Sequence, residues 1–271
     1  MPEGDTIFRA ARALNKALSG QTITHFESVF PHLNRIDEDS PIAGRTLRSV
    51  EARGKHLLMH VSGGLSLRTH MRMTGSWHIY RPGEAWQRPR AQMRILLETA
   101  AFHAVAFSVH EAEWLRDEQL ARSRIGQLGP DLLAPNFDAD AAVSRMQARA
   151  GEPICDVLLD QRALAGIGNV YKSEVLFLRG VHPLTDVRSL TPATLRDLAC
   201  TAQQLLQANV ESAGPRRTTR RGDPSESLWV YGRAKLPCRR CGTPIVSSAV
   251  GKHVRTTYHC PRCQRLTGSS G

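Results

Sequence analysis

Four of the six cysteines lie near the carboxyl end of the 271-residue chain, in two C-x2-C pairs separated by 18 residues: Cys238, Cys241, Cys260 and Cys263. Two such turns can bring four thiolates to one tetrahedral centre, which is typical of a structural zinc site. Because four protein ligands leave no position open for water or substrate, we expect one Zn²⁺ that stabilises the fold. Four unrelated thiols and a redox-active dithiol are the less favoured interpretations, since no strand followed by a helix is predicted around either pair. Cys155 and Cys200 fall in helical patterns and are expected to be small buried residues.

The same part of the chain carries most of the excess positive charge. The whole chain has 36 Lys and Arg against 25 Asp and Glu, a net charge of +11, and residues 215–271 alone hold 12 basic and 2 acidic residues. A basic stretch can be merely a solvated face, but beside the cysteine pairs it favours a polyanionic partner, namely nucleic acid. A membrane is not favoured, because no apolar stretch approaches about 18 residues and Glu3 and Asp5 stand where a signal peptide is positive. We therefore expect a cytoplasmic protein.

The segment 165–174, AGIGNVYKSE, is rich in glycine and lies between two predicted helices. It is not a dinucleotide-binding turn, because Tyr171 replaces the third glycine and a helical pattern precedes the segment. Gly166, Gly168 and Asn169 instead allow a tight turn whose backbone N–H groups lie at the start of a helix, where an anion binds readily. DNA phosphate is the natural anion for a basic chain, and a plain loop between packed helices is the alternative.

The periodicity of apolar residues predicts an α+β protein. A first helix is expected from Asp5 or Thr6 to Gly20, followed by short strands with turn signals between them, which suggests a sandwich or barrel. These strands are expected at 22–29, 46–53, 56–61, 65–71, 76–80, 93–97 and 104–109. Helices are then expected at 111–122, 138–150, 153–159, 171–178 and 191–211, the last one capped by Thr191.

Three motifs together carry a resemblance to a known family. They are the amino-terminal PEGD at 2–5, the segment LDQRALAGIGNVYKSE at 159–174, and the cysteine module with VYGR before it and VRTTYHCPRC inside it. In this order they resemble the formamidopyrimidine-DNA glycosylase and endonuclease VIII family of DNA repair enzymes. The resemblance implies an N-terminal β-sandwich domain (1–125), a helix-two-turn-helix DNA-binding domain (126–225) and a C-terminal zinc finger (226–271).

The resemblance also implies the catalytic residues. The family's nucleophile is an amino-terminal proline, which Pro2 supplies once Met1 is removed, and Glu3 matches the acid that protonates the sugar ring oxygen. A terminal secondary amine has a pKa of roughly 8, so part of it is unprotonated at neutral pH and can attack C1′ of a deoxyribose. Lys55 matches the family's second lysine, and Arg255 the arginine of δ-elimination. Within this scheme the zinc holds the loop that carries Arg255.

A glycosylase turns its target base out of the duplex, and the gap must be filled. The segment HMRMTG at 70–75 lies at the place of the family's intercalating loop, which makes Arg72 and Met73 the candidate wedge. Gln127, Gly168 and Asn169 are the further candidates for DNA contacts.

The sequence favours the oxidised-pyrimidine branch of the family over the oxidised-purine branch. The segment VHEAEWLRDEQLA at 109–121 lacks the Arg and Phe pair that completes the wedge of the purine enzymes, and the opening PEGDT resembles endonuclease VIII. Met73 favours the oxidised-purine branch instead, because it resembles the wedge residue of that branch.

We therefore expect a monomeric, bifunctional glycosylase and abasic-site lyase that acts on damaged double-stranded DNA and nicks it by β,δ-elimination. A non-catalytic zinc-containing DNA-binding protein is the alternative from another class, but it would not need a proline at its terminus. A single-strand binder is disfavoured, because only 6% of the residues are aromatic.

Overall fold

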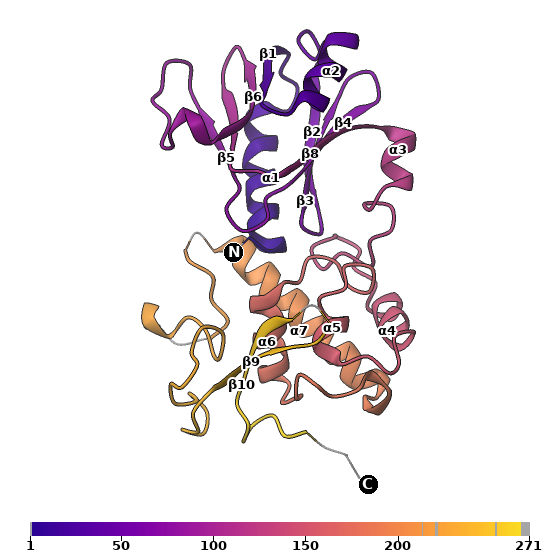
Figure 1. Ribbon diagram of the computed structural model, residues 1–271, viewed down its shortest axis with the longest axis vertical. Helices are drawn as coiled ribbons and strands as arrows, with labels where there is room; N and C mark the ends of the chain where they lie inside the picture. The colour runs from indigo at the N-terminus through magenta and orange to yellow at the C-terminus, as the bar shows by residue number, and fades with distance from the viewer. Residues whose placement is uncertain (1, 213, 220–221, 253, 267–271) are drawn as a thin grey trace. The chain divides into compact units, whose positions relative to one another are not determined.

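The structure, a computed structural model, describes residues 2–212, 214–219, 222–252 and 254–266 (Figure 1). The chain divides into two compact units, Met1–Gln127 and Leu128–Gly271, and each is described by itself. The three-part division at residues 125 and 225 stays a prediction; the first unit ends two residues after its first boundary. None of the described helices is both long and apolar enough to cross a membrane.

As far as the structure describes it, the first unit is a sandwich of two antiparallel four-stranded sheets with three α-helices and one 3₁₀ turn. One sheet has the strand order β1-β6-β7-β5 and the other β2-β3-β4-β8. The strands are β1 (Ile23–Ser28), β2 (Leu47–Arg53), β3 (His56–Val61), β4 (Leu65–His70), β5 (Ser76–Tyr80), β6 (Met93–Thr99), β7 (His103–Phe107) and β8 (Glu111–Arg116), and the helices are α1 (Gly4–Leu18), α2 (Pro31–Asp39), the 3₁₀ turn η1 (Arg90–Gln92) and α3 (Asp117–Arg122).

Alternation of side chains along the strands gives this unit two cores. On β7, Ala104 and Ala106 belong to the main core with α1 and the other sheet, whereas Val105 and Phe107 face the opposite side. That opposite side is covered by Trp86 from the β5–β6 connection. The central strands β6 and β7 are therefore buried on both faces, which explains why they are nearly continuous apolar runs.

Helix α1 is fixed along β2, the outer strand of its sheet. The Oδ1 atom of Asn15 accepts a hydrogen bond from the backbone N–H of Val50 at 2.8 Å, and the Ser19 hydroxyl donates to the carbonyl of Arg48 at 2.7 Å. The helix therefore runs antiparallel to β2. Its amino terminus reaches the end of β2 where the β2–β3 turn begins, as Figure 1 shows. This arrangement brings the start of the chain and that turn to the same end of the sandwich.

Three sequence expectations for this unit were wrong in detail. The helix expected at 111–122 is strand β8 followed by α3, because Ala112 and Trp114 enter the sandwich core while β8 pairs with β4. Helix α2, which starts with Pro31, was not expected. Helix α1 begins at Gly4, with Glu3 rather than Asp5 or Thr6 as its N-cap residue.

The second unit consists of helices around one core and a small hairpin. It contains α4 (Ala139–Gln147), α5 (Ile154–Val157), α6 (Asn169–Leu178), η2 (Val187–Ser189), α7 (Pro192–Glu211), η3 (Pro224–Glu226) and the strands β9 (Val246–Val250) and β10 (Arg255–His259). Helix α7 begins as expected, with the Thr191 hydroxyl accepting from the Thr194 N–H. Cys155 is buried in α5, and burial together with nearby Asp156 raises the pKa of its thiol to about 11. Cys200, expected to be buried, is only partly so.

A fully buried carboxylate joins α6 to the segment that precedes the cysteines. Glu174 accepts hydrogen bonds from three consecutive backbone N–H groups, those of Trp229, Val230 and Tyr231, at 2.8 to 2.9 Å, and from the hydroxyl of Thr218. These donors satisfy a carboxylate that could not otherwise be buried. Asn209 at the end of α7 holds the backbone of Arg217 in the same way, with hydrogen bonds to its N–H and its carbonyl.

We predict that Asn15→Ala lowers the free energy of unfolding by about 1–3 kcal/mol, because the N–H of Val50, which is 6% exposed, loses its acceptor. Asn15→Asp keeps an acceptor at this position and should cost less. Urea denaturation of the two variants and the wild type measures the difference. Equal stabilities for the wild type and the alanine variant would show that this bond does not fix α1.

Candidate functional site

The chain begins at the amino terminus of α1. Glu3 is 1% exposed and has an extended backbone, and its carbonyl accepts from the N–H groups of Thr6 and Ile7 at 3.0 and 3.1 Å. Pro2, which is partly buried, directly precedes this N-cap residue, whereas Met1 lies outside the described residues. The backbone of Pro2 is therefore held next to the positive end of a helix dipole, which disfavours a proton on a nearby amine.

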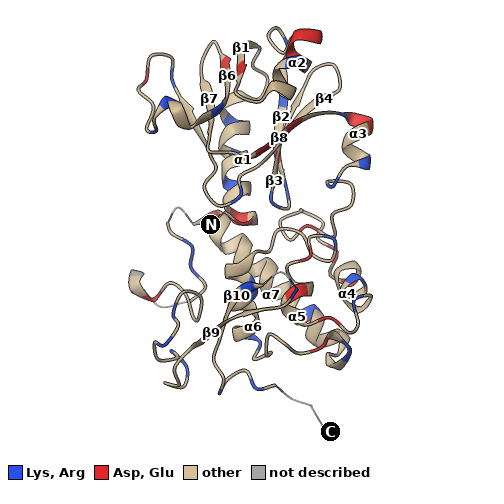
Figure 2. Ribbon diagram, in the orientation of Figure 1, with Lys and Arg blue, Asp and Glu red and all other residues tan. Residues whose placement is uncertain are grey.

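Lys55 lies in the two-residue turn between β2 and β3, and its side chain is partly exposed. Gly54 has a φ of 58°, which the first position of such a hairpin turn requires, and Arg53 pairs with His56 across it. Since α1 runs antiparallel to β2, Lys55 and Glu3 lie at the same end of the first unit. Figure 2 shows basic residues at the tip of this hairpin and acidic residues at the start of α1.

The loop after β4 exposes an apolar side chain. Met73 is 67% exposed, and the loop is closed by a hydrogen bond from the N–H of Gly75 to the carbonyl of Met71 at 2.8 Å. A Cβ atom on Gly75 would lie 2.5 Å from that same carbonyl oxygen, so only glycine fits there. Arg72 has a φ of 51° and forms an ion pair with Glu111 on β8. Burial opposes ionisation of Glu111, but the hydrogen bond and charge of Arg72 lower the pKa of its carboxyl.

Two histidines, His70 and His56, lie next to this loop and contact each other. The Nδ1 atom of His70 accepts from the N–H of Arg72 at 3.0 Å, and its ring contacts that of His56 with the centroids 4.9 Å apart. Arg68 donates to Nδ1 of His56 at 3.0 Å and forms an ion pair with Glu113. Burial lowers the pKa of His56 to about 3 and that of His70 to about 4, so both rings are neutral at pH 7.

In the second unit, the predicted glycine turn leads directly into α6. Gly166 has a φ of 103°, Gly168 is the N-cap residue with an extended backbone, and Asn169 is the first helical residue. The Nδ2 atom of Asn169 donates to the carbonyl of Thr256 in β10 at 2.8 Å. The turn and the start of β10 are therefore joined by a side chain, and the turn leads into the positive end of the α6 helix dipole.

Arg255 begins strand β10 and pairs with Val250, the last residue of β9, at the end of the hairpin where the two strands are connected. Its side chain is exposed, and among the described residues its guanidinium has no hydrogen-bond or ion-pair partner. A guanidinium is always charged and binds two phosphate oxygens at once, so this position suits a phosphate contact. The hairpin connection is held by Asp156 of α5, which accepts from the N–H of Lys252 at 2.9 Å.

The four expected cysteines form one cluster, with all their Sγ atoms within 4.8 Å of one another. The Sγ atoms of Cys238 and Cys263 are 4.0 Å apart, and those of Cys241 and Cys260 are 3.5 Å apart. Four sulfurs about 2.3 Å from a central ion would be about 3.8 Å apart, so the cluster fits a tetrahedral metal such as zinc. Cys238 and Cys260 also pack against Phe177 of α6.

Each unit therefore brings some of the expected residues together. Pro2, Glu3 and Lys55 share one end of the first unit, and Gly168, Asn169 and Arg255 lie around the start of α6 and β10 in the second. Gln127, the last residue of the first unit, is exposed and lies in neither group. Sequence reasoning missed Glu111 as the partner of Arg72, and it missed Lys172, although the spacing of three residues from Asn169 on one helix was a usable signal.

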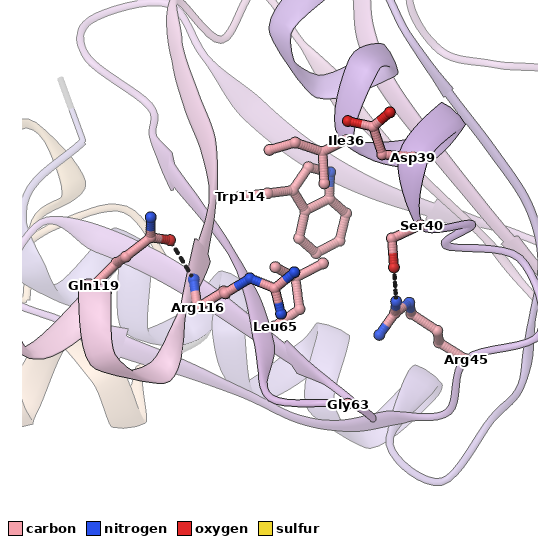
Figure 3. Close-up of a pocket in the computed structure, with 9 residues that line it drawn as sticks. All are labelled: Ile36, Asp39, Ser40, Arg45, Gly63, Leu65, Trp114, Arg116 and Gln119. Atoms are coloured by element: carbon pink, nitrogen blue, oxygen red, sulfur yellow. Dashed lines mark hydrogen bonds between the residues drawn. The ribbon is translucent and has the colours of Figure 1, made fainter.

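A cavity of about 210 Å³ in the first unit lies away from these residues (Figure 3). It is lined by Trp114, Leu65 and Ile36 with polar groups around them, and it borders Gly63 in the β3–β4 turn. That turn and the Lys55 turn are at opposite ends of β3. This cavity is therefore not part of the candidate site.

Comparison with protein families matches two models. The formamidopyrimidine-DNA glycosylase N-terminal domain matches residues 1–110, and the formamidopyrimidine-DNA glycosylase H2TH domain matches residues 128–220.

The chain is also similar over nearly its whole length to curated proteins. It is 43% identical to a probable endonuclease 8 2 of Streptomyces coelicolor, with 97% of this chain and 94% of that protein covered. It is 38% identical to the DNA-(apurinic or apyrimidinic site) lyase Nei2 of Mycolicibacterium smegmatis (97% and 99% covered) and 32% identical to the formamidopyrimidine-DNA glycosylase of Chloroflexus aurantiacus (97% and 98%). The fold matches that of the Lactococcus lactis formamidopyrimidine-DNA glycosylase bound to DNA with an abasic site, with a TM-score of 0.82 at 23% identity over 97% of this chain and 100% of that one.

The buried histidines predict a loss of stability in acid. In the unfolded chain both rings take up a proton near pH 6.5, whereas in the folded chain His70 resists until about pH 4 and His56 until about pH 3. The contribution of these two neutral rings to the free energy of unfolding is therefore complete above about pH 6.5 and falls as the pH drops toward 4. Comparing urea midpoints at pH 7 and pH 4.5 measures it. His70→Asn keeps an acceptor for Arg72 without titrating and should show a smaller drop; an undiminished drop would contradict this role.

Proposed function

The chain belongs to the formamidopyrimidine-DNA glycosylase and endonuclease VIII family of DNA glycosylases and abasic-site lyases, and from this premise we propose that it removes oxidised pyrimidines from double-stranded DNA and nicks the strand by β,δ-elimination. The observation that carries the proposal is the placement of Pro2 directly before buried Glu3 at the start of α1. We propose that the protein acts as a monomer.

Pro2 is the proposed nucleophile after removal of Met1. Its nitrogen attacks C1′ of the damaged nucleoside, the bond from C1′ to the base breaks, and opening of the sugar gives an iminium between the proline and C1′. The ring oxygen takes up a proton as the sugar opens, and Glu3 is the proposed donor. The positive end of α1 helps to keep the amine unprotonated, and positioned acids of this kind contribute roughly 10² to 10⁴ in rate.

Elimination from the iminium cleaves the strand twice. Loss of a C2′ proton expels the 3′ phosphate, and a second elimination expels the 5′ phosphate. Lys55, on the hairpin turn, is the proposed group for the proton transfers beside the phosphate. Arg255, whose guanidinium has no partner among the described residues, is the proposed contact to the departing phosphates. Gly168 and Asn169 are proposed to bind DNA phosphate at the start of α6, and Gln127 is proposed as a further DNA contact.

Met73 is the proposed wedge, since an apolar side chain that is 67% exposed on a closed loop can enter a base step. Arg72 is the proposed contact to the base left without a partner. To make that contact its guanidinium has to leave Glu111, and an exposed ion pair of this kind costs only about 0–1 kcal/mol to break.

The preference for oxidised pyrimidines is supported by β8. In the stretch 109–121, which lacks the Arg and Phe pair of the purine enzymes, β8 holds Glu111 and Glu113, and these pair with Arg72 and Arg68. The relatives named endonuclease 8, endonuclease 8 2 or Nei2 are 32% to 43% identical to this chain, and the formamidopyrimidine-DNA glycosylase of Chloroflexus is 32% identical. The exposed Met73 favours oxidised purines as the second candidate.

Borohydride trapping tests the nucleophile and the lesion class together. We expect a covalent complex with duplexes that contain an abasic site or an oxidised pyrimidine, and a weaker one with oxidised guanine. Pro2→Gly or a chain that retains Met1 should trap at least tenfold less, because the secondary amine is lost or blocked. Glu3→Gln should slow base removal by about 10² to 10⁴. The absence of a trapped species with every lesion would favour a non-catalytic DNA-binding protein, and stronger trapping on oxidised guanine the purine branch.

The four-cysteine cluster is the proposed site of one structural zinc ion, which would hold the segment around β9 and β10. We expect a chelator to abolish nicking while the sandwich, which contributes none of the four ligands, stays folded. Metal analysis by mass spectrometry, circular dichroism and a nicking assay before and after chelation measure this. Full-rate nicking by metal-free protein would show that Arg255 does not act from this hairpin.

A further inference from the structure

Lys172 is a buried ammonium group in the first turn of α6. The residue is 1% exposed, and its Nζ atom donates to Oδ1 of Asn169 at 2.7 Å and to Oγ1 of Thr257 at 2.6 Å. Burying a charge is costly unless hydrogen bonds replace the lost water. A lysine at this place with only a packing role could be replaced by an apolar residue of the same length. Its polar contacts therefore indicate a further role.

The direction of every hydrogen bond in this group is fixed by the ammonium. Because an ammonium has donors and no acceptor, the oxygen of the Asn169 amide has to face it, and the Nδ2 group is turned to the carbonyl of Thr256. The Thr257 hydroxyl likewise accepts from Lys172, so its own hydrogen is available to the carbonyl of Arg255 at 3.1 Å. One charge thus orients two neighbouring side chains.

Both of these side chains end on the backbone of β10. The amide of Asn169 donates to the carbonyl of Thr256. The hydroxyl of Thr257, a residue that is 0% exposed, donates to the carbonyl of Arg255. The guanidinium of Arg255 has no described partner of its own, so the position of this residue is set through its backbone. The connection between β9 and β10 has a separate attachment, from Lys252 to Asp156. The group around Lys172 is therefore the attachment nearest to Arg255 on its own strand.

We propose that Lys172 is a positioning residue, which sets the backbone of Arg255 and the amide of Asn169 relative to the start of α6. The inference rests on the proposed function, in which these two residues contact phosphates of the DNA. A phosphate contact made by a long exposed side chain depends on where its backbone is held, and misplacement by about 1 Å can cost 10²-fold in rate. Lys172 itself touches neither substrate nor solvent in this role.

The test uses the full-length, metal-loaded protein on a duplex with a preformed abasic site, under single-turnover conditions. Lys172→Met keeps the length of the side chain and removes the donors, whereas Thr257→Val removes only the hydroxyl. Both should lower the ratio of δ- to β-elimination product at least tenfold, while borohydride trapping by Pro2 changes less than threefold. Thr257→Ser keeps the hydroxyl and should restore the ratio. Lys16→Met, on the exposed face of α1, is the matched control for a lost positive charge.

The outcomes separate this inference from the proposed function. A wild-type protein that nicks no abasic duplex contradicts the proposed function itself. Wild-type protein that gives β product alone contradicts the role of Arg255, and this inference with it. A normal wild-type pattern that Lys172→Met and Thr257→Val both leave unchanged contradicts the positioning role only. If Lys172→Met loses its metal or fails to fold, the comparison of Thr257→Val with Thr257→Ser decides.

Discussion

The first unit depends on how α1 is held against an outer strand. Pro2, the proposed nucleophile after removal of Met1, is covalently held on one side only, so its position has to come from the residue that follows it. Here that residue is Glu3, which is buried and begins a helix. The helix is attached through Asn15, whose Oδ1 atom accepts a hydrogen bond from the N–H of Val50 on the edge strand of the sheet. One hydrogen bond therefore serves both to cover a sheet edge and to direct the chain terminus toward the Lys55 turn.

In the second unit, the guanidinium of Arg255 is exposed and is not neutralised by a described carboxylate. For Arg255, the proposed phosphate contact, an ion pair with a carboxylate would compete with the DNA. The guanidinium of Arg255 has no partner among the described residues, and the backbone carbonyl of Arg255 accepts a hydrogen bond from the Thr257 hydroxyl. The contrast with Arg72, which forms an ion pair with Glu111, shows both arrangements in one chain. The arrangement at Arg255 leaves the guanidinium available to a ligand, whereas Arg72 has to leave Glu111 before it can bind one.

The sequence was sufficient wherever the signal was local. The spacing of the cysteines predicted their cluster, and strong alternation predicted β5 with its correct ends. Strand β8 was mistaken for a helix, because Asp117–Arg122 directly continue it with helix-forming residues and no turn signal separates the two; only the pairing of β8 with β4 shows that it is a strand. The contacts of Arg72 with Glu111 and of Lys172 with Thr257 join residues 39 and 85 positions apart, so they depend on strand register and tertiary packing.

The hydrogen bonds that Glu174 accepts limit which part of the second unit can change in sequence. Its carboxylate fixes Trp229, Val230 and Tyr231, and Asn209 fixes Arg217 at the end of α7, so the stretch between these two anchors has both ends tethered. A closed loop of this kind can differ in length or composition from one homologue to another without pulling on either flank. Changes in this stretch are therefore separated by the two anchors from the four-cysteine cluster that follows Tyr231.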